Sequence, residues 1–218
     1  MEEIRILWLF DDLLDLYGDS GNIRILEYYL KKNGIPYSII RKGLYDDTDL
    51  SGYDFIYCGP GKLKNLLKAA EKMHGLQKEV REAIESGTLM LFTGSSMLLL
   101  GKEIRDKDGN TIACSSVFDY SGEDLDKVMI EDVVTSHPYT ESRIYGFINR
   151  TARLMDETEE QKKNGFHKNN LWATWLLGPL FVKNPELLSW YYEKLTGQKL
   201  NLNDSLEMQA YRKTMEEF

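Results

Sequence analysis

Residues Leu91–Gly101, LFTGSSMLLLG, place two serines in a tight turn between an apolar run and a second apolar stretch. A strand, a turn and a helix in this order form the nucleophile elbow of many hydrolases, in which a strained turn lifts one side chain above the end of a sheet. Gly94 suits such a turn, because a residue without a side chain adopts a left-handed backbone at little cost. A hydrolase carries serine or cysteine at the apex, whereas the apex predicted here is Gly94.

Ser95 and Ser96 are the candidate replacement nucleophiles, since serine hydrolases use similar turns. A nucleophilic serine needs a neighbouring base to accept its proton. The histidines His74, His137 and His167 lie in segments predicted to be helix or loop, away from the end of this strand. We therefore predict that one of the two serines caps the helix that follows.

Cys58 ends an apolar run, and Cys114 is the second of the two cysteines in the sequence. Two cysteines in a chain of this length do not form a disulfide framework, and neither has metal-ligand spacing relative to a histidine. Free cysteines are usually small buried apolar residues. We expect two buried, unreactive thiols, no metal site and no cofactor.

Two further motifs have a structural interpretation. Residues 59–62, Gly-Pro-Gly-Lys, lack the spacing of a phosphate-binding loop, so we expect a tight turn ahead of a helix. Asp11, Asp12, Asp15 and Asp19 form an acidic cluster without the pattern of a calcium loop. These carboxylates are expected to cap a helix start and to face solvent.

Composition narrows the class of protein. The 218 residues have a net charge of −8, with 42% hydrophobic and 28% charged residues, as in a soluble globular protein with a single domain over residues 1–218. Binding of nucleic acid needs clustered Lys and Arg, which the acidic balance disfavours. The start Met1-Glu2-Glu3 does not resemble a signal peptide, and no apolar run reaches transmembrane length. We expect a cytoplasmic protein without membrane insertion.

The first half of the chain alternates apolar runs with amphipathic stretches, which predicts an α/β fold with a mostly parallel sheet and helices on both faces. The predicted strands are Ile4–Phe10, Tyr37–Ile40, Tyr53–Cys58 and Leu89–Phe92. Helices are expected over about 22–32, where Asn33-Gly34 ends the pattern, and over about 63–86, with a break near His74-Gly75.

The second half is less regular. Strand-like stretches at 127–134 and 143–149 predict an antiparallel region added to the sheet, and the charged segment Asp156–Asn170 is expected to be a solvated loop. Leu171–Leu177 is predicted to be a buried strand, followed by helices from Pro185 to about Leu195 and over about 204–217. Four large aromatic residues are expected in the core: Trp172, Trp175, Tyr191 and Tyr192.

Five segments, in order along the chain, resemble the class I glutamine amidotransferase superfamily, in its cobyric-acid-synthase-like (CobQ-like) and GatD-like branch. They are LFDDLLDLYGDSGNI (9–23), YDFIYCGPG (53–61), LFTGSSMLLLG (91–101), YGFINRTAR (145–153) and ATWLLGPLFVKNP (173–185). Because these segments span nearly the whole chain, the resemblance is more specific than any single motif. It implies a flavodoxin-like three-layer α/β/α sandwich.

The departures from the family pattern fall at its catalytic positions. The resemblance places the cysteine of the family at Gly94, its histidine at Leu177 and its glutamine at Leu98, while Glu-Asn-His becomes Ile148-Asn149-Arg150. Glutamine hydrolysis needs a thiolate and an imidazole that moves its protons. Loss of such a coupled pair costs about 10⁴-fold or more in rate, so we predict that this chain has no catalytic residues for that reaction.

The glycines preserve the backbone shape of the family cleft, which is therefore expected to survive as a vestigial cleft. Its predicted positions are Gly59, Gly61, Gly94, Ser95, Leu98 and Leu177.

The resemblance implies three functional hypotheses. The first is a degenerate domain that acts as a partner-binding or regulatory subunit beside a Mur-ligase-like (MurT-like) synthetase of cell-wall precursor amidation, or a synthetase of cobalamin biosynthesis. The second is an active glutaminase or amidase with displaced catalytic groups, such as Ser95 or Cys58, that supplies ammonia to a synthetase. The third is a sensor of glutamine or another small molecule in the residual cleft.

Overall fold

The computed structural model describes residues 2–218, apart from the side chain of Asp126, and its centre is a six-stranded sheet. Five of the strands are parallel, and β9 joins the edge antiparallel to β10. In order across the sheet the strands are β2 (Tyr37–Lys42), β1 (Ile4–Leu9), β3 (Phe55–Cys58), β4 (Leu89–Thr93), β10 (Leu171–Thr174) and β9 (Phe166–Lys168). The near-continuous apolar runs of β3, β4 and β10 are buried throughout, as expected of parallel strands covered on both faces.

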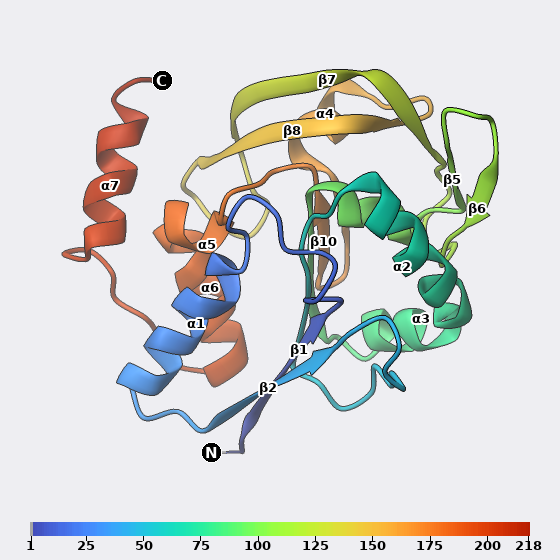
Figure 1. Ribbon diagram of the computed structural model, residues 1–218. Coiled ribbons are helices and arrows are strands. Elements are labelled where there is room, and N and C mark those ends of the chain that lie inside the picture. The colour runs from blue at the N-terminus through green and yellow to red at the C-terminus, as the bar shows by residue number, and fades with distance from the viewer. Residues whose placement is uncertain (1) are drawn as a thin grey trace.

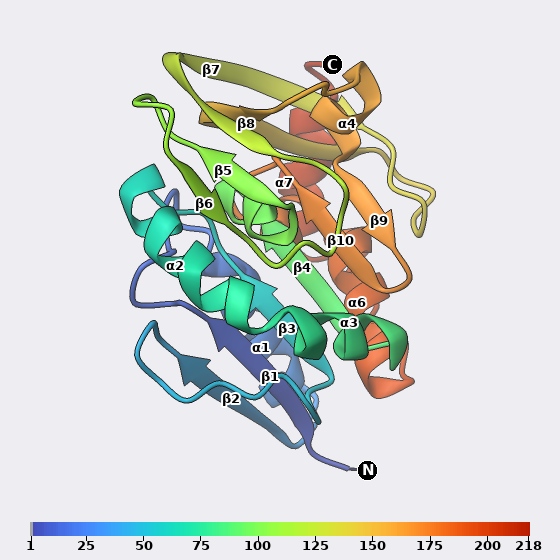
Figure 2. The same ribbon diagram turned by 90° about the vertical axis from the view of Figure 1, so that its right-hand side faces the viewer.

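Helices cover both faces of this sheet, as predicted (Figure 1). On one side lie α1 (Gly21–Lys32), α5 (Leu180–Lys183) and α6 (Pro185–Thr196), with α7 (Leu206–Met215) packed outside them. On the other lie α2 (Leu63–Gly75) and α3 (Gln77–Glu85), which meet at the predicted break (Figure 2). The chain therefore forms the expected flavodoxin-like α/β/α sandwich.

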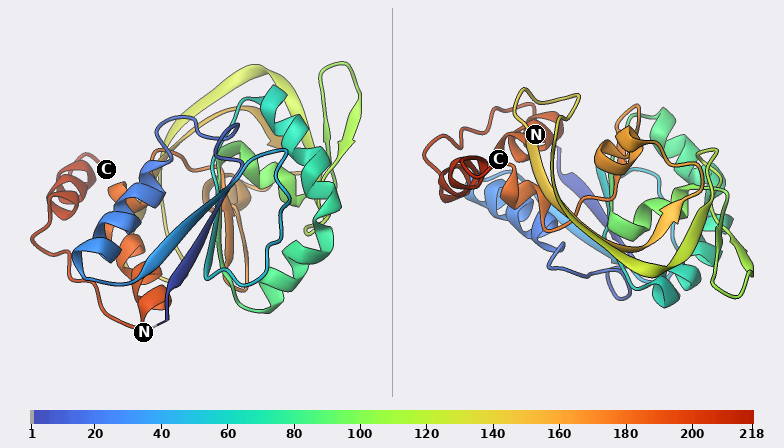
Figure 3. Two further views of the ribbon diagram at one scale, coloured as in Figure 1. Left: turned by 60° about the horizontal axis from the view of Figure 1, so that its bottom comes forward. Right: turned by 90° about the horizontal axis from the view of Figure 1, so that it is seen from above.

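A second, four-stranded sheet arches over the carboxyl ends of the parallel strands (Figures 1 and 3). It has the order β6 (Thr111–Ala113), β5 (Glu103–Arg105), β7 (Gly122–Thr135) and β8 (Ile144–Leu154). The prediction of an antiparallel region was correct, but the prediction that this region extends the central sheet was wrong, because it forms a separate sheet. In β8 alternate residues are buried, so this ribbon lays one face across the end of the central sheet. Within residues 2–218, a single isolated β-bridge, Phe147 to Leu177, connects β8 to the turn that follows β10.

The prediction of a solvated loop over Asp156–Asn170 was also wrong. Helix α4 (Glu159–Asn164) begins at a capping box, in which Thr158 and Gln161 bond each other's backbone N–H, and β9 follows directly. The run of charged side chains obscured both elements, although Thr158 and Gln161 were a readable helix-start signal.

The core forms as the sequence predicts. The four large aromatic residues expected there are each at most 1% exposed, and both cysteines are buried. Within the described part of the chain, no helix combines the length and the apolar character needed to cross a bilayer.

Candidate functional site

The turn after β4 has the backbone of a nucleophile elbow. Gly94 has a φ of +56°, which a side chain would strain, and it opens a 3₁₀-helix, η1 (Gly94–Leu100). The elbow was therefore predicted correctly. The prediction that a serine caps the helix was wrong, because Thr93 stands at the cap position and makes no side-chain cap hydrogen bond.

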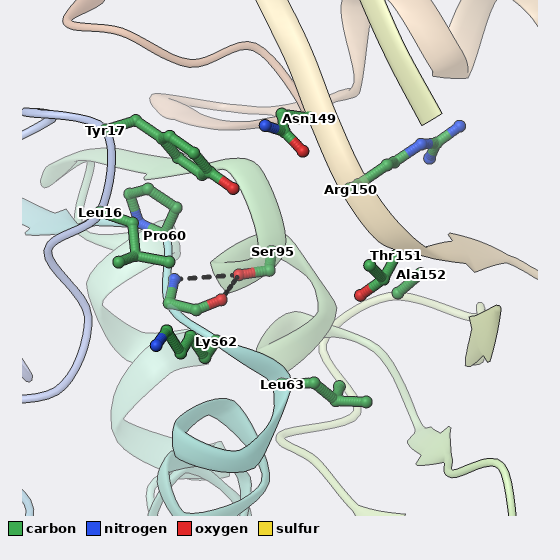
Figure 4. A pocket seen from close by; sticks show the side chains of 11 residues that line it. Leu16, Tyr17, Pro60, Lys62, Leu63, Ser95, Asn149, Arg150, Thr151 and Ala152 are labelled. Atoms are coloured by element: carbon green, nitrogen blue, oxygen red, sulfur yellow. Dashed lines mark hydrogen bonds between the residues drawn. The ribbon is translucent and has the colours of Figure 1, made fainter. Parts of the chain in front are cut away.

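The two serines bind neighbouring strand ends instead. The Ser95 hydroxyl donates to the carbonyl of Gly61 at 2.9 Å and accepts the Gly61 N–H at 3.0 Å (Figure 4). The Ser96 hydroxyl donates to the carbonyls of Cys58 and Thr93. Both hydroxyls are thus held by backbone groups across the sheet, and this competition removes them from the cap.

The histidines do not reach the elbow. Nδ1 of His74 lies 3.0 Å from the carbonyl of Cys114. His137 and His167 pack against each other, with ring centroids 5.1 Å apart, and both contact Trp172. The prediction that His167 lies in a helix or loop was wrong, because it belongs to β9.

Gly94 and Leu177, at the predicted positions of the family cysteine and histidine, face each other. A β-carbon added at Gly94 would overlap Cδ2 of Leu177 and lie 2.8 Å from Cβ of Pro60. Leu177 is 1% exposed, so its side chain fills the space above the elbow. The space that a catalytic side chain would need at position 94 is occupied by leucine.

Leu98, at the predicted position of the family glutamine, is a packing residue. Its side chain is fully buried, and a β-carbon added at Gly122 would lie 2.7 Å from its Cδ2. Leu98, where the resemblance places a glutamine, thus connects η1 to the start of β7 by apolar contact.

Gly59 and Gly61 allow the loop after β1 to approach closely. A β-carbon at Gly59 would lie 2.7 Å from the Leu14 carbonyl oxygen, and one at Gly61 would overlap the Leu14 side chain. This close approach of two backbones explains why glycine occupies both positions.

Asp19 contradicts the prediction of a solvent-facing cap, because it is fully buried. Its Oδ2 accepts hydrogen bonds from Thr93 at 2.5 Å and from the Tyr57 hydroxyl at 3.2 Å. Its Oδ1 accepts the Gly178 N–H at 2.6 Å. Burial raises the pKa of Asp19 to about 6, against the lowering effect of these hydrogen bonds. Asp15 does accept a backbone N–H at the start of α1, that of Ser20, at 3.0 Å.

A cavity of about 190 Å³ lies beside Ser95 (Figure 4). Its lining residues are Leu16, Tyr17, Pro60, Gly61, Lys62, Leu63, Ser95, Asn149, Arg150, Thr151 and Ala152. Of the predicted cleft positions, the cavity includes Gly61 and Ser95, whereas Gly59, Gly94, Leu98 and Leu177 are outside its lining. Sequence reasoning missed Tyr17, which lies in a segment that carries the resemblance, and interpreted Lys62 only as the end of a tight turn.

Arg150 lines this cavity but directs its guanidinium away from it (Figure 4). The guanidinium forms two hydrogen bonds with the Glu157 carboxylate, at 2.7 and 2.6 Å, and lies over the Trp175 ring at 4.2 Å. The Trp175 indole N–H also donates to Glu157 at 2.5 Å. A buried ion pair thus occupies the region where the family pattern has a histidine.

Neither thiol is placed for nucleophilic chemistry. Burial raises the pKa of Cys58 far above its ordinary value, and burial raises that of Cys114 to about 12. A nucleophilic cysteine requires the opposite shift, toward the thiolate. Ser95, Cys58 and Cys114 are therefore poor nucleophiles in their present surroundings.

A parallel sheet between helices, with an elbow turn at the end of β4, is the architecture that the resemblance to class I glutamine amidotransferases implies. The chain belongs to the CobB/CobQ-like glutamine amidotransferase domain family, whose sequence profile matches residues 5–185. This confirms the family that the resemblance implied.

Two relatives are GatD subunits of a glutamine-hydrolysing lipid II isoglutaminyl synthase. That of Staphylococcus aureus is 27% identical over 212 residues, covering 91% of this chain and 87% of the relative. That of Streptococcus pneumoniae is 24% identical over 225 residues, covering 96% of this chain and 86% of the relative. The solved structure of PurLQS from Thermotoga maritima has a similar fold, with a TM-score of 0.50 and 14% identity, covering 98% of this chain and 100% of that one.

Proposed function

We propose that this chain is a non-hydrolysing member of its family, retained as a partner-binding or regulatory subunit of an amide-forming synthetase. The packing of Leu177 into the space above Gly94 is the observation that carries the proposal. This packing removes both the room for a nucleophile and the imidazole that would activate it.

The partner that this proposal implies is a Mur-ligase-like synthetase. The two GatD relatives are named as subunits of an isoglutaminyl synthase that acts on lipid II, and each is matched over most of its length. The proposal implies that this chain keeps the surface that contacts a synthetase although it does not hydrolyse glutamine. A synthetase of cobalamin biosynthesis is the other candidate, because a cobyrinate a,c-diamide synthase is 24% identical over 191 residues.

The test has two measurements. The chain is co-expressed with a tagged Mur-ligase-like protein from an adjacent gene, and the stoichiometry of the purified complex is measured. Glutamate and ammonia release from glutamine is then assayed with the chain alone and with the complex. We expect a stable complex and no glutamine turnover above that of the synthetase alone.

Two variants make the assay specific to this chain. Ser95→Ala and Cys58→Ala each remove a candidate displaced nucleophile. Turnover that requires the chain and disappears in either variant would establish the rival function, an active glutaminase. A chain that forms no complex with a synthetase would contradict the proposed role as a subunit.

The cavity beside Ser95 supports a second candidate function, a small-molecule sensor. Tyr17 and Asn149 direct polar groups into it (Figure 4), and among its described lining residues there is no carboxylate. Thermal-shift measurements with glutamine, glutamate and nucleotides test this candidate. A stabilisation that Tyr17→Ala abolishes would support it, and the absence of any stabilisation would count against it.

A further inference from the structure

One edge of β7 is unpaired along most of its length. β7 pairs with β8 on one side as far as Thr135, whereas on the other side β5 pairs with it at Gly122 and Glu123. Across the described residues, no strand pairs with that second edge beyond Glu123. Figures 1 and 3 show β7 as the outermost strand of the arch, with this edge turned away from the rest of the molecule.

Apolar side chains accompany the free edge. Val128 is 49% exposed and Ile130 is 73% exposed, among the most exposed aliphatic residues of the chain. Proteins usually protect such an edge with charged side chains, proline, a bulge or a short strand, because its free N–H and C=O groups are a template for another strand. β7 has an irregularity between Asp124 and Met129, but its register with β8 is regular from Met129 to Thr135. That regular stretch can accept a further strand by backbone hydrogen bonding.

The charge of β7 restricts what can pair with it. Its sequence, GEDLDKVMIEDVVT, contains five acidic residues and one lysine, in a chain of net charge −8. Glu131 and Asp132 are both exposed and follow Ile130 directly. A second copy paired antiparallel at this edge would bring these carboxylates against their own counterparts, and like charges opposite each other destabilise a sheet. A strand with lysine or arginine would instead meet complementary charge.

We infer that residues 129–134 of β7 are a docking edge for an extended segment of a protein partner, with alternating basic and apolar side chains. This inference rests on the proposed function as a partner-binding subunit and assigns that role to a particular surface. Backbone hydrogen bonds would provide affinity, and contacts with Val128, Ile130, Glu131 and Asp132 would provide specificity.

The test uses three fluorescein-labelled seven-residue peptides, with anisotropy and amide hydrogen exchange as the measurements. One alternates lysine and valine, the second alternates glutamate and valine, and the third is the lysine peptide with proline at its centre. We expect the lysine peptide to bind and to slow exchange at residues 129–134. Both other peptides should bind at least about tenfold more weakly, because one is repelled and the other lacks a central N–H.

Matched variants separate this edge from general attraction to an acidic protein. The variant Glu131→Lys/Asp132→Lys should bind the lysine peptide at least about tenfold more weakly than wild type. The control Glu85→Lys/Glu193→Lys makes the same change in net charge at exposed positions of α3 and α6, and it should leave binding unchanged. Equal effects of the two variants, equal binding of the proline peptide, or protection outside β7 would each overturn the inference.

Two further outcomes are decisive. A concentration-dependent dimer in sedimentation that is abolished by Ile130→Lys would identify a second copy as the occupant of the edge and refute the basic partner. A Glu131→Lys/Asp132→Lys chain that still forms the synthetase complex would refute the docking edge while leaving the proposed subunit role intact. Failure of the wild-type chain to form that complex would refute the subunit role, and the peptide measurements would still decide the inference about β7.

Discussion

Asp19 accepts the backbone N–H of Gly178 at 2.6 Å, a contact between residues 159 positions apart. Its other carboxylate oxygen accepts the hydroxyl of Thr93. Because Thr93 precedes Gly94 and Gly178 follows Leu177, one buried carboxylate joins the two segments in which the resemblance places the cysteine and histidine of the family. The position of Leu177 over the elbow therefore depends on an acidic residue outside both segments.

The raised pKa of Asp19 predicts a pH dependence of stability. The pKa rises from an ordinary value of 3.8 to about 6, so the folded protein holds this proton more tightly than the unfolded chain. The resulting stabilisation is complete below about pH 4 and is lost as the pH rises through about 6. Asp19→Asn removes this titration but keeps a carbonyl oxygen for the Gly178 N–H. Between about pH 4 and pH 7.5, wild type should lose roughly 2.4 kcal/mol more unfolding free energy than Asp19→Asn, measured by urea denaturation. Parallel pH profiles of the two proteins would contradict the prediction.

The burial of His137 predicts the opposite dependence, in which the unfolding free energy falls as the pH decreases. Its ring is 3% exposed, and burial, with a smaller contribution from the charge of His167, lowers the pKa of His137 to about 3. The unfolded chain then binds more protons, so the stabilisation is complete above about pH 6.5 and is lost as the pH falls toward 3. His137→Phe keeps an aromatic ring against Trp172 and should lose less stability than wild type between about pH 7 and pH 4. His167→Phe, whose histidine has a pKa lowered to about 4 by burial, should show the same effect to a smaller extent.

The contact between Gly94 and Leu177 predicts strong coupling in a double-mutant cycle. Gly94→Ala should destabilise the protein by about 2–4 kcal/mol, because the new methyl group meets Leu177 and the backbone is left-handed. Leu177→Ala should cost about 2–5 kcal/mol through a cavity. The double variant should be more stable than the sum of these losses by at least about 1 kcal/mol, since the methyl group enters the vacated space. Additive losses in denaturant unfolding would show that the two side chains do not share this space.

The buried pair of Arg150 and Glu157 predicts an asymmetric loss of stability. Both side chains are 3% exposed, so Glu157→Gln leaves a buried guanidinium without its counter-charge and should cost about 3–5 kcal/mol. Arg150→Met/Glu157→Leu removes both charges and should cost less than this single change. Glu82→Gln breaks the exposed pair with Lys78 and should cost under about 1 kcal/mol, which makes it the matched control. A double variant less stable than Glu157→Gln would contradict the prediction.

The parallel half of the fold was readable from the sequence because its strands are buried on both faces. Runs such as Tyr53–Cys58 and Leu89–Phe92 are almost wholly apolar, and glycine marks the turns that follow them. The elements over Asp156–Asn170 were missed because a strand of three residues and a helix of six mostly charged residues are too short to show a hydrophobic pattern. Their existence depends on tertiary contacts, such as the pairing of β9 with β10.

At the candidate site, the sequence located the elbow but not the contacts around it. The departures at Gly94 and Leu177 were visible by comparison with the family pattern, whereas their mutual packing depends on how the turn after β10 approaches β4. Asp19 was misread because its partners Thr93 and Gly178 are distant in the chain and local reasoning treats an acidic cluster as a solvated helix start. The prediction of a single domain over residues 1–218 stays a prediction.

The leucine above the elbow also bears on whether single substitutions could introduce a nucleophile and a base at these two positions. A cysteine introduced first at position 94 would meet the Leu177 side chain and destabilise the fold, while a histidine introduced first at position 177 would leave a polar ring in an apolar space with no sulfur beside it. Each single substitution therefore carries a cost in stability. A nucleophile at position 94 and a base at position 177 would therefore be introduced at a smaller cost in stability together than one at a time.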